Sequence, residues 1–554
     1  MRRTLIALAL LNIAAFPGAA VAAPPTPPQA REVPPESGAA TSSTLQGLAC
    51  PGPTTCVGVG TSLYAGGKTT AVGAGTSAFG VWQQTVLPLN SGSAYDSVSC
   101  IAVAECEAVG TDTVHASTLN SGKAFESGLV VSILNGFWNT SLIGLPNNAN
   151  LGAGGATQVT LDSVSCPGTY ACVAVGSYTA SDGTVQAMTA TQVGQNWAQS
   201  ATELTLPATA AVTAQNADLH SVVCSSPGDC QAVGWYTNAS GTTKPMVATE
   251  TNGTWAPAVA ITLTGSAVGA AELRSLFCTS AGNCAAVGHY TTAHSGQRPL
   301  ALTESNGTWR AAFEPPLPAD ARAGATQSAD LDSVVCSSVG NCQAVGGYAN
   351  SLGDRLPLAE TESSGSWTLT AGGVQLPPNA STKPGAQRAN LSAVVCPVST
   401  SCLAVGDYIV QAKMTEAMSV AIAPLQTGSV SINAVKVAGD QLSATVACGP
   451  HRRQACLGTL TLGAFEHLNG KRITAVTVGQ KKKNTLAVTF GKSSYRLRGG
   501  AHSRLTIKLD GAGERLLTQF HTLQLTLAAT AVGQTAPAVA STVAFTAPQP
   551  PTHK

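Results

Sequence analysis

Sixteen cysteines offer the clearest chemistry in this 554-residue sequence, and fourteen of them recur with one spacing. Five residues separate the members of each pair, so a short hairpin would bring their Cβ atoms within disulfide range. Zinc is the alternative, but zinc clusters usually have C-x2-C or C-x2-4-C spacing and a second pair. We expect seven hairpin disulfides, each contributing about 2 kcal/mol. The pairs are Cys50–Cys56, Cys100–Cys106, Cys166–Cys172, Cys224–Cys230, Cys278–Cys284, Cys336–Cys342 and Cys396–Cys402.

The cysteines belong to a repeat that reads S-V-x-C, five residues, then C-x-A-V-G, and two of its positions vary while their neighbours stay fixed. One follows the A-V-G glycine and the other precedes S-V. Equivalent positions of a ring-shaped repeat protein lie in a circle, and variable loops on a rigid scaffold suit a ligand site. The alternative is that these positions are ordinary solvent-exposed turns. The ligand-binding candidates are Asp162, His220, Trp235, Arg274, His289, Asp332 and Asp407.

Signatures of catalysis are missing from the sequence. The nine histidines are scattered, with no H-E-x-x-H, and there is no G-x-S-x-G elbow, phosphate-binding G-x-x-x-x-G-K or EF-hand loop. Glu250, Glu304 and Glu362 recur too regularly to form a single acid and base pair, so we interpret them as hydrogen-bond acceptors within repeats. The sequence therefore predicts no catalytic residue, no metal and no cofactor.

Short strands must position these residues. A typical repeat contains the S-V-x-C segment, the C-x-A-V-G segment, a segment ending in T-E, and a segment beginning at a tryptophan such as Trp255 or Trp309, and the last repeat lacks this tryptophan. Asn252-Gly253 and Asn306-Gly307 supply the positive φ angles of tight hairpins. Four strands in each of seven repeats predict a seven-bladed β-propeller over residues 45–427, an architecture that leaves few exposed strand edges. An open β-solenoid or a string of small sandwiches is the competing architecture.

Composition agrees with an all-β protein that is exported. Only 10% of residues are charged, and there are 57 Gly and 31 Pro, which suits many strands and turns and excludes coiled coils. Residues 1–22 have the charged, apolar and A-x-A order of a secretory signal, and no later stretch is apolar and long enough to span a membrane. Residues 23–44 are rich in proline and are expected to be a linker, either a spacer or a simple tail.

The C-terminal part has a different charge. Residues 428–554 contain 15 Lys and Arg against 4 Asp and Glu, giving +11, whereas the preceding residues contain 14 and 24, giving −10. Alternating apolar segments predict a small antiparallel β-sandwich over residues 428–548, followed by a tail over 549–554. Its basic residues Lys471, Arg472, Lys481, Lys482 and Lys483 are candidates for binding anionic polymers. A solvated loop that balances the acidic repeats is the equally weighted alternative.

Two resemblances rest on these residues. Strings such as SVSCPGTYACVAVG resemble the repeats of secreted actinobacterial proteins, over about Leu45 to Thr427, which implies export and a propeller-like fold but brings no catalytic residues. The C-x7-C pair Cys448 and Cys456, with the later YRLRGGAHSRLTIKLDGAGERLL, resembles the immunoglobulin-like modules that end many actinobacterial exported proteins. This resemblance implies a disulfide-bonded immunoglobulin-like sandwich.

Three functional hypotheses follow. The first is an exported, non-enzymatic binding protein whose partner is a surface or wall polymer, a glycan or a protein. The second is an extracellular hydrolase or lyase that acts on a glycan through Asp and His of the variable positions. The third is a structural component of the cell envelope. Sequence-specific nucleic-acid binding is not expected, because the basic segment lacks interleaved aromatics and any known reading motif.

Overall fold

The computed structural model describes most of the chain between residues 28 and 547. The described ranges are 28–33, 40–52, 55–64, 69–78, 81–86, 93–102, 105–115, 124–134, 137–150, 158–198, 200–263, 269–292, 296–363, 365–370, 373–398, 401–410, 414–422, 426–427, 430–449, 454–469, 472–478, 485–498, 501–531 and 539–547. The expected signal segment 1–22 and the tail 549–554 lie outside them. Within these ranges no helix is long and apolar enough to cross a membrane.

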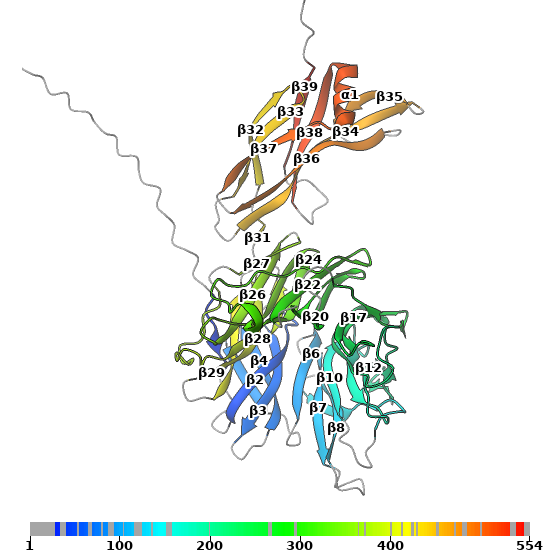
Figure 1. The fold of residues 1–554 in the computed structure, drawn as a ribbon, viewed down its shortest axis with the longest axis vertical. Coiled ribbons are helices and arrows are strands. Elements are labelled where there is room, and N and C mark those ends of the chain that lie inside the picture. The colour runs from blue at the N-terminus through cyan, green and yellow to red at the C-terminus, as the bar shows by residue number, and fades with distance from the viewer. Residues whose placement is uncertain are drawn as a thin grey trace, which may run out of the picture.

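The repeats form antiparallel sheets, and the described strands of residues 31–422 make seven of them (Figure 1). Sheet 1 contains β2 (Ala40–Ala49), β3 (Cys56–Tyr64), β4 (Thr69–Ala78) and β5 (Val81–Val86), and sheet 2 contains β6 (Ala94–Ala102), β7 (Glu105–His115), β8 (Ala124–Leu134) and β9 (Phe137–Leu142). Sheet 3 contains β10 (Val159–Ser165), β11 (Val173–Thr179), β12 (Val185–Val193), β13 (Asn196–Trp197) and β14 (Thr202–Glu203), and sheet 4 contains β15 (Ala217–Ser226), β16 (Asp229–Thr237), β17 (Thr243–Thr251), β18 (Thr254–Trp255) and β19 (Val259–Ala260).

The remaining three sheets follow the same order. Sheet 5 contains β20 (Ala271–Ser280), β21 (Asn283–Thr291), β22 (Gln297–Ser305) and β23 (Thr308–Trp309), and sheet 6 contains β24 (Ala329–Ser338), β25 (Asn341–Ala349), β26 (Arg355–Ser363) and β27 (Ser366–Leu369), after a short 3-10 turn at Gly324–Thr326. Sheet 7 contains β28 (Ala389–Val398), β29 (Ser401–Ile409), β30 (Thr415–Ile422) and β1 (Arg31–Glu32).

The strand pairing confirms how the repeat was interpreted. The S-V-x-C segment is the first strand of each sheet and pairs with the C-x-A-V-G strand, which pairs with the T-E strand. Glu250 pairs with Trp255 and Glu304 with Trp309, so the tryptophan lies in the next strand, which begins one residue before it. Asn252 and Asn306 have φ of 50° and 51° in the intervening turns.

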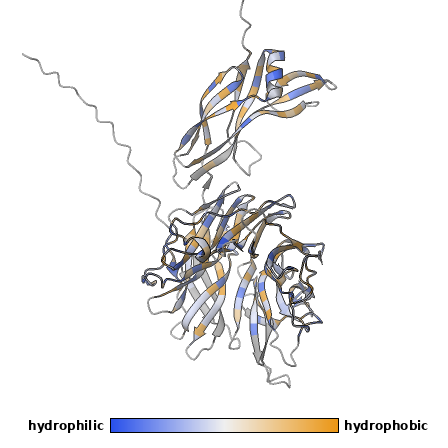
Figure 2. Cartoon of the chain, viewed as in Figure 1, coloured by the Kyte–Doolittle hydropathy of each residue, from blue (hydrophilic) through white to orange (hydrophobic). Residues whose placement is uncertain are grey.

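The sheets are arranged in a closed, propeller-like ring. The first strand of each sheet contacts the first strand of the next, in the cycle β2, β6, β10, β15, β20, β24, β28 and back to β2. Apolar clusters fill the spaces between neighbouring sheets, and each cluster takes residues from more than one sheet. Figure 2 shows orange apolar residues interspersed with paler polar ones along the strands, as expected of sheets with a buried face.

The serine of the S-V motif joins neighbouring sheets. Its hydroxyl oxygen accepts a hydrogen bond from a backbone amide on the first strand of the following sheet. These bonds run from Val164 N to Ser97, Val222 N to Ser163, Leu276 N to Ser221, Val334 N to Ser275 and Val394 N to Ser333, at 3.1–3.3 Å. The serine is replaced by Ala393 in sheet 7 and by Gly47 in sheet 1, on either side of the junction where the ring closes.

The N-terminal segment closes the ring, which corrects the expectation that residues 23–44 are only a linker. Arg31 and Glu32 pair with Ser419 and Met418 and form the outer strand of sheet 7. Val33 is fully buried, and its amide donates to the carbonyl of Ala417 at 2.8 Å. Sheet 7 has no Trp strand of its own in the described residues, so a strand from the other end of the ring takes the free edge of β30.

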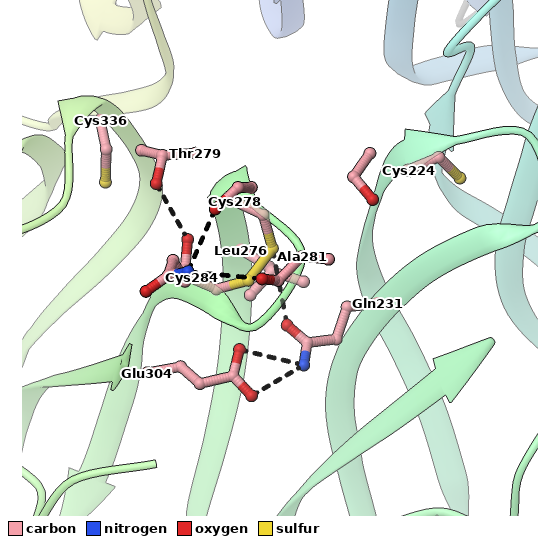
Figure 3. The surroundings of a disulfide bond; sticks show 12 residues. Cys224, Gln231, Leu276, Cys278, Thr279, Ala281, Cys284, Glu304 and Cys336 are labelled. Carbon is pink, nitrogen blue, oxygen red and sulfur yellow. Dashed lines mark hydrogen bonds between the residues drawn. A yellow bond between two sulfur atoms is a disulfide. The ribbon is translucent and has the colours of Figure 1, made fainter. Parts of the chain in front are cut away.

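All sixteen cysteines are paired, as predicted. The seven hairpin disulfides have Cα–Cα distances of 3.9–4.1 Å, and Cys448–Cys456 spans 5.6 Å. Figure 3 shows the Cys278–Cys284 bridge beside Gln231 of sheet 4, whose amide donates to both carboxylate oxygens of Glu304 in sheet 5 at 3.2 Å. Thr303 of sheet 5 likewise donates to Glu362 of sheet 6. Glu304 and Glu362 therefore accept hydrogen bonds between repeats rather than within them.

The C-terminal part has two sheets that share one apolar core. One sheet contains β32 (Val430–Ala438), β33 (Gln441–Cys448) and β37 (His502–Lys508). The other contains β31 (Gln426–Thr427), β34 (Gln454–Asn469), β35 (Arg472–Thr477), β36 (Thr485–Arg498), β38 (Thr522–Ala531) and β39 (Val539–Thr546). The core includes Leu442 and Ile507 from the first and Leu460, Phe490 and Leu525 from the second.

A helix was not predicted in this part. The helix α1 (Gly511–Phe520) begins after Asp510, whose carboxylate accepts hydrogen bonds from the amides of Ala512 and Gly513. This is the usual N-terminal cap of a helix. Leu516 and Leu517 are buried against the sandwich core.

Candidate functional site

A β-bulge in the first strand of every sheet carries the variable residue that precedes S-V. The pairing register shifts at that residue in all seven sheets. A bulge leaves one residue unpaired and redirects its side chain, and bulges are frequent beside functional sites. The bulge residues are Gln46, Asp96, Asp162, His220, Arg274, Asp332 and Ser392.

The bulge also explains the glycine of A-V-G. It pushes a carbonyl of the first strand toward the second strand, so a Cβ built on Gly234 would lie 1.9 Å from the carbonyl oxygen of Asp218. The same clash, at 1.9–2.2 Å, occurs at all seven equivalent glycines. Only glycine fits there, and the repeated glycine thus marks the place where the bulge redirects a side chain.

Side chains from the bulges and from adjacent positions form two hydrogen-bonded groups that influence each other electrostatically, and we call the whole set the inner polar ring. It contains the seven predicted candidates and several residues that the sequence analysis did not select. The full set is Asp96, Asp162, Asp218, His220, Trp235, Glu272, Arg274, His289, Asp330, Asp332, Arg355, Asn390 and Asp407.

The first half of the ring, the acidic sector, contains Asp96, Asp162, Asp218, His220 and Trp235. Nδ1 of His220 lies 3.2 Å from Asp162 Oδ2, and the indole Nε1 of Trp235 donates to His220 Nε2 at 3.0 Å. Because Nε2 accepts this bond, the imidazole is neutral and its proton lies on Nδ1, facing Asp162. Side chains of Asp162 and His220 remain 20% and 26% exposed, so a ligand can reach them.

Crowded carboxylates perturb the acidic sector. Burial raises the pKa of Asp218 and the nearby Asp162 carboxylate raises it further, to about 8. The same two causes raise the pKa of Asp96 to about 7. Burial lowers the pKa of His220, while Asp162, Asp218 and Glu272 raise it, to about 9 on balance. The Trp235 hydrogen bond opposes that protonation, since an imidazolium has no lone pair on Nε2.

The second half, the arginine sector, has its charges paired. Arg274 contacts Glu272 at 2.7 Å and Asp332 at 2.8 Å, and His289 Nδ1 lies 3.4 Å from Glu272. Burial raises the pKa of Glu272, but His289 and Arg274 lower it by more. The pKa of Glu272 therefore lies below its ordinary value.

Arg355 continues the arginine sector from the third strand of sheet 6. It donates to Asp330 at 2.5 Å and to Asn390 at 3.0 Å, and Asn390 donates to Asp332 at 2.7 Å. Burial raises the pKa of Asp407 to about 6, and Arg355 limits this increase. Every predicted ligand-binding candidate therefore belongs to the inner polar ring.

Several members of the ring could have been found from the sequence. Asp218, Glu272, Asp330 and Asn390 all stand two residues before the bulge, a third variable position of the repeat. Asp218 pairs with Trp235, Glu272 with His289 and Asn390 with Asp407 across the first two strands. Arg355 belongs to a third strand, and only the fold brings it to the ring.

Three atoms of the acidic sector have the proximity expected of metal ligands. Ligand atoms of Asp162, Asp218 and His220 lie within 4.8 Å of one another. The Trp235 bond argues against a metal there, because Nδ1 of His220 carries the proton and has no free lone pair.

The basic candidates of the C-terminal part are mostly outside the described residues. This holds for Lys471, Lys481, Lys482 and Lys483. Arg472 begins β35 and is exposed.

Comparison with known proteins finds remote structural similarities. No family model and no curated protein matches the chain. Solved structures that resemble it include SapL1 lectin in complex with alpha methyl fucoside (10% identity, 61% of this chain and 98% of that one, TM-score 0.35). NanB sialidase from Streptococcus pneumoniae, as its K499G mutant, has 9% identity over 71% and 70% of the two chains, with a TM-score of 0.36. An ulvan lyase has 8% identity over 69% and 94%, with a TM-score of 0.37. These similarities carry no argument about binding, and the fold rests on the strand pairing described above.

Proposed function

We propose that the protein is an exported, non-enzymatic binding protein in which a seven-bladed β-propeller is the recognition platform and a basic, immunoglobulin-like module contacts anionic surface or wall polymers. The observation that supports recognition is the inner polar ring. Five of the seven bulges direct residues of differing chemistry into one partly exposed network, while the strands that hold them repeat almost unchanged. A glycan, with its many hydroxyl groups, suits such an arrangement of acids, amides and arginines.

The enzymatic alternative is a hydrolase or lyase that acts on a glycan, and the His220–Asp162 pair is the observation that favours it. A histidine oriented by a carboxylate is a common general base. Here the nitrogen that would accept the substrate proton, Nε2, already accepts the Trp235 hydrogen bond. We therefore favour binding over catalysis.

Binding of the purified protein to arrays of glycans and wall polymers, at low and high salt, tests the proposal. We expect salt-resistant binding of a glycan that weakens at least tenfold in Arg274→Gln, which removes two ion pairs of the ring, but not in the exposed-loop variant Asp182→Asn. Salt-sensitive retention by anionic polymers should disappear when Lys481, Lys482 and Lys483 are changed to Ser. Release of glycan fragments would instead support the enzyme, and unchanged binding in Arg274→Gln would remove the ring from the proposal.

A further inference from the structure

The acidic sector crowds carboxyl groups together, and no arginine or lysine is among the groups that perturb Asp96 and Asp218. The charged groups that perturb Asp218 are Asp162 and His220, and the one that perturbs Asp96 is Asp162. In the arginine sector, by contrast, two arginines each contact carboxylates. Three carboxylates therefore face one histidine, and a cation placed among them would relieve their repulsion.

One acceptor of this sector has no partner. Oδ1 of Asp218 is shielded from solvent and has no hydrogen-bond partner within the chain, although the same carboxyl group hydrogen-bonds with Asp162 and Ser177. A buried carboxylate oxygen without a donor is costly. It indicates that a donor is supplied from outside the chain.

Two features select the kind of cation. The ligand atoms of Asp162, Asp218 and His220 lie within 4.8 Å of one another. An ammonium that donates N–H···O bonds of about 2.8 Å in tetrahedral directions would hold its acceptors about 4.6 Å apart, a separation that this upper limit allows. A metal ion would need the Nδ1 lone pair of His220, which the Trp235 bond withholds, whereas an ammonium needs only carboxylate oxygens.

We propose that the acidic sector, Asp96, Asp162 and Asp218 with His220 and Trp235, is a binding site for an alkylammonium group of the ligand. This rests on the proposed recognition role of the inner polar ring and narrows it: the ligand presents a free amine, as an amino sugar or a lysine side chain does, and donates hydrogen bonds to Asp162 and Asp218.

Calorimetry with 1,5-diaminopentane at about pH 8, where an alkylamine is protonated, tests this site, with pentane-1,5-diol as the neutral control of the same length. We expect the diamine to bind at least tenfold more tightly than the diol. The variants Asp162→Asn and Asp218→Asn should each weaken diamine binding at least tenfold, whereas the exposed-loop variant Asp182→Asn should not. Both substitutions reduce carboxylate crowding, so the variants should fold, which circular dichroism checks.

The outcomes separate this inference from the proposed function. Equal binding of diamine and diol would overturn the ammonium site, and so would tight binding of Zn²⁺ or Mn²⁺ that displaces the diamine and depends on His220. If a neutral glycan binds in an Arg274-dependent manner while the diamine does not, the ring remains a recognition site and only the ammonium inference fails. If no ligand depends on either sector, both fail.

Discussion

The hydroxyl oxygen of Ser163 accepts a hydrogen bond from the backbone amide of Val222 at 3.1 Å and joins two sheets whose bonded residues are 59 positions apart in sequence. Val222 is buried, so loss of this acceptor would leave an unsatisfied amide inside the ring. We expect Ser163→Ala to lower the free energy of unfolding by about 1–3 kcal/mol. Urea denaturation measures the change, with the exposed turn variant Ser240→Ala as control. Equal midpoints for the two variants would show that the serine does not hold the sheets together.

The glycines beside the bulges have no tolerated substitute. A Cβ at Gly234 would lie 1.9 Å from the carbonyl oxygen of Asp218, and relief of that clash requires the first two strands of sheet 4 to separate. We expect Gly234→Ala to destabilise the protein by more than about 4 kcal/mol, a range that marks disrupted backbone packing. Gly168→Ala is the matched control, because nothing lies within 4 Å of its added Cβ, and it should change stability by less than about 0.5 kcal/mol. Thermal unfolding compares the two, and similar melting temperatures would contradict the bulge geometry.

The repeat pattern allowed much of this fold to be predicted. The fixed spacing of Cys224 and Cys230 gave the disulfide and the hairpin, and the Glu250–Trp255 register followed from the Asn-Gly turn. Local spacing determines these features, so they are visible within one repeat. The variable position of His220 could be selected for the same reason, since its neighbours do not vary.

Features that depend on distant residues could not be predicted. The pairing of Arg31 with Ser419 joins the two ends of the ring. A strand of two residues is too short to show the alternation of apolar and polar residues that predicts a strand. The position of Arg355 beside Asn390 likewise depends on how sheets 6 and 7 pack. The helix over Gly511–Phe520 was missed because the flanking alternation favoured strands, although Asp510 is an ordinary capping residue.

A buried acid in sheet 6 makes stability depend on pH. Glu360 is fully buried, neither of its carboxylate oxygens has a hydrogen-bond partner, and burial raises its pKa to about 9 from 4.5. The folded state therefore keeps this proton up to about pH 9, whereas the unfolded chain releases it near pH 4.5. Over that interval the folded state binds more protons, so the free energy of unfolding falls as pH rises.

Glu360→Leu tests this origin, because leucine occupies the equivalent position in sheet 5 as Leu302. We expect the urea midpoint of the wild-type protein to decrease between about pH 5 and pH 9, and the decrease to be clearly smaller in the variant. The isosteric Glu360→Gln should also flatten the profile, which separates loss of the ionisable group from better packing. Parallel profiles for all three proteins would assign the pH dependence to other groups.

Because the N-terminal segment closes the ring, we expect a substitution at one residue outside the repeats to destabilise the whole protein. Val33 is fully buried in a cluster with Leu45 and Leu403, between sheets 1 and 7, and its amide donates to Ala417. An aspartate there would place an unpaired charge in an apolar site, so we expect Val33→Asp to lower stability by several kcal/mol. Arg31→Asp changes an exposed side chain of the same segment and should have little effect, because its backbone pairing with Ser419 is retained. Thermal unfolding of the two variants measures the difference. A Val33→Asp protein as stable as the Arg31→Asp protein would mean that the segment does not close the ring, whereas a large loss confined to Val33→Asp would support its role in holding sheets 1 and 7 together.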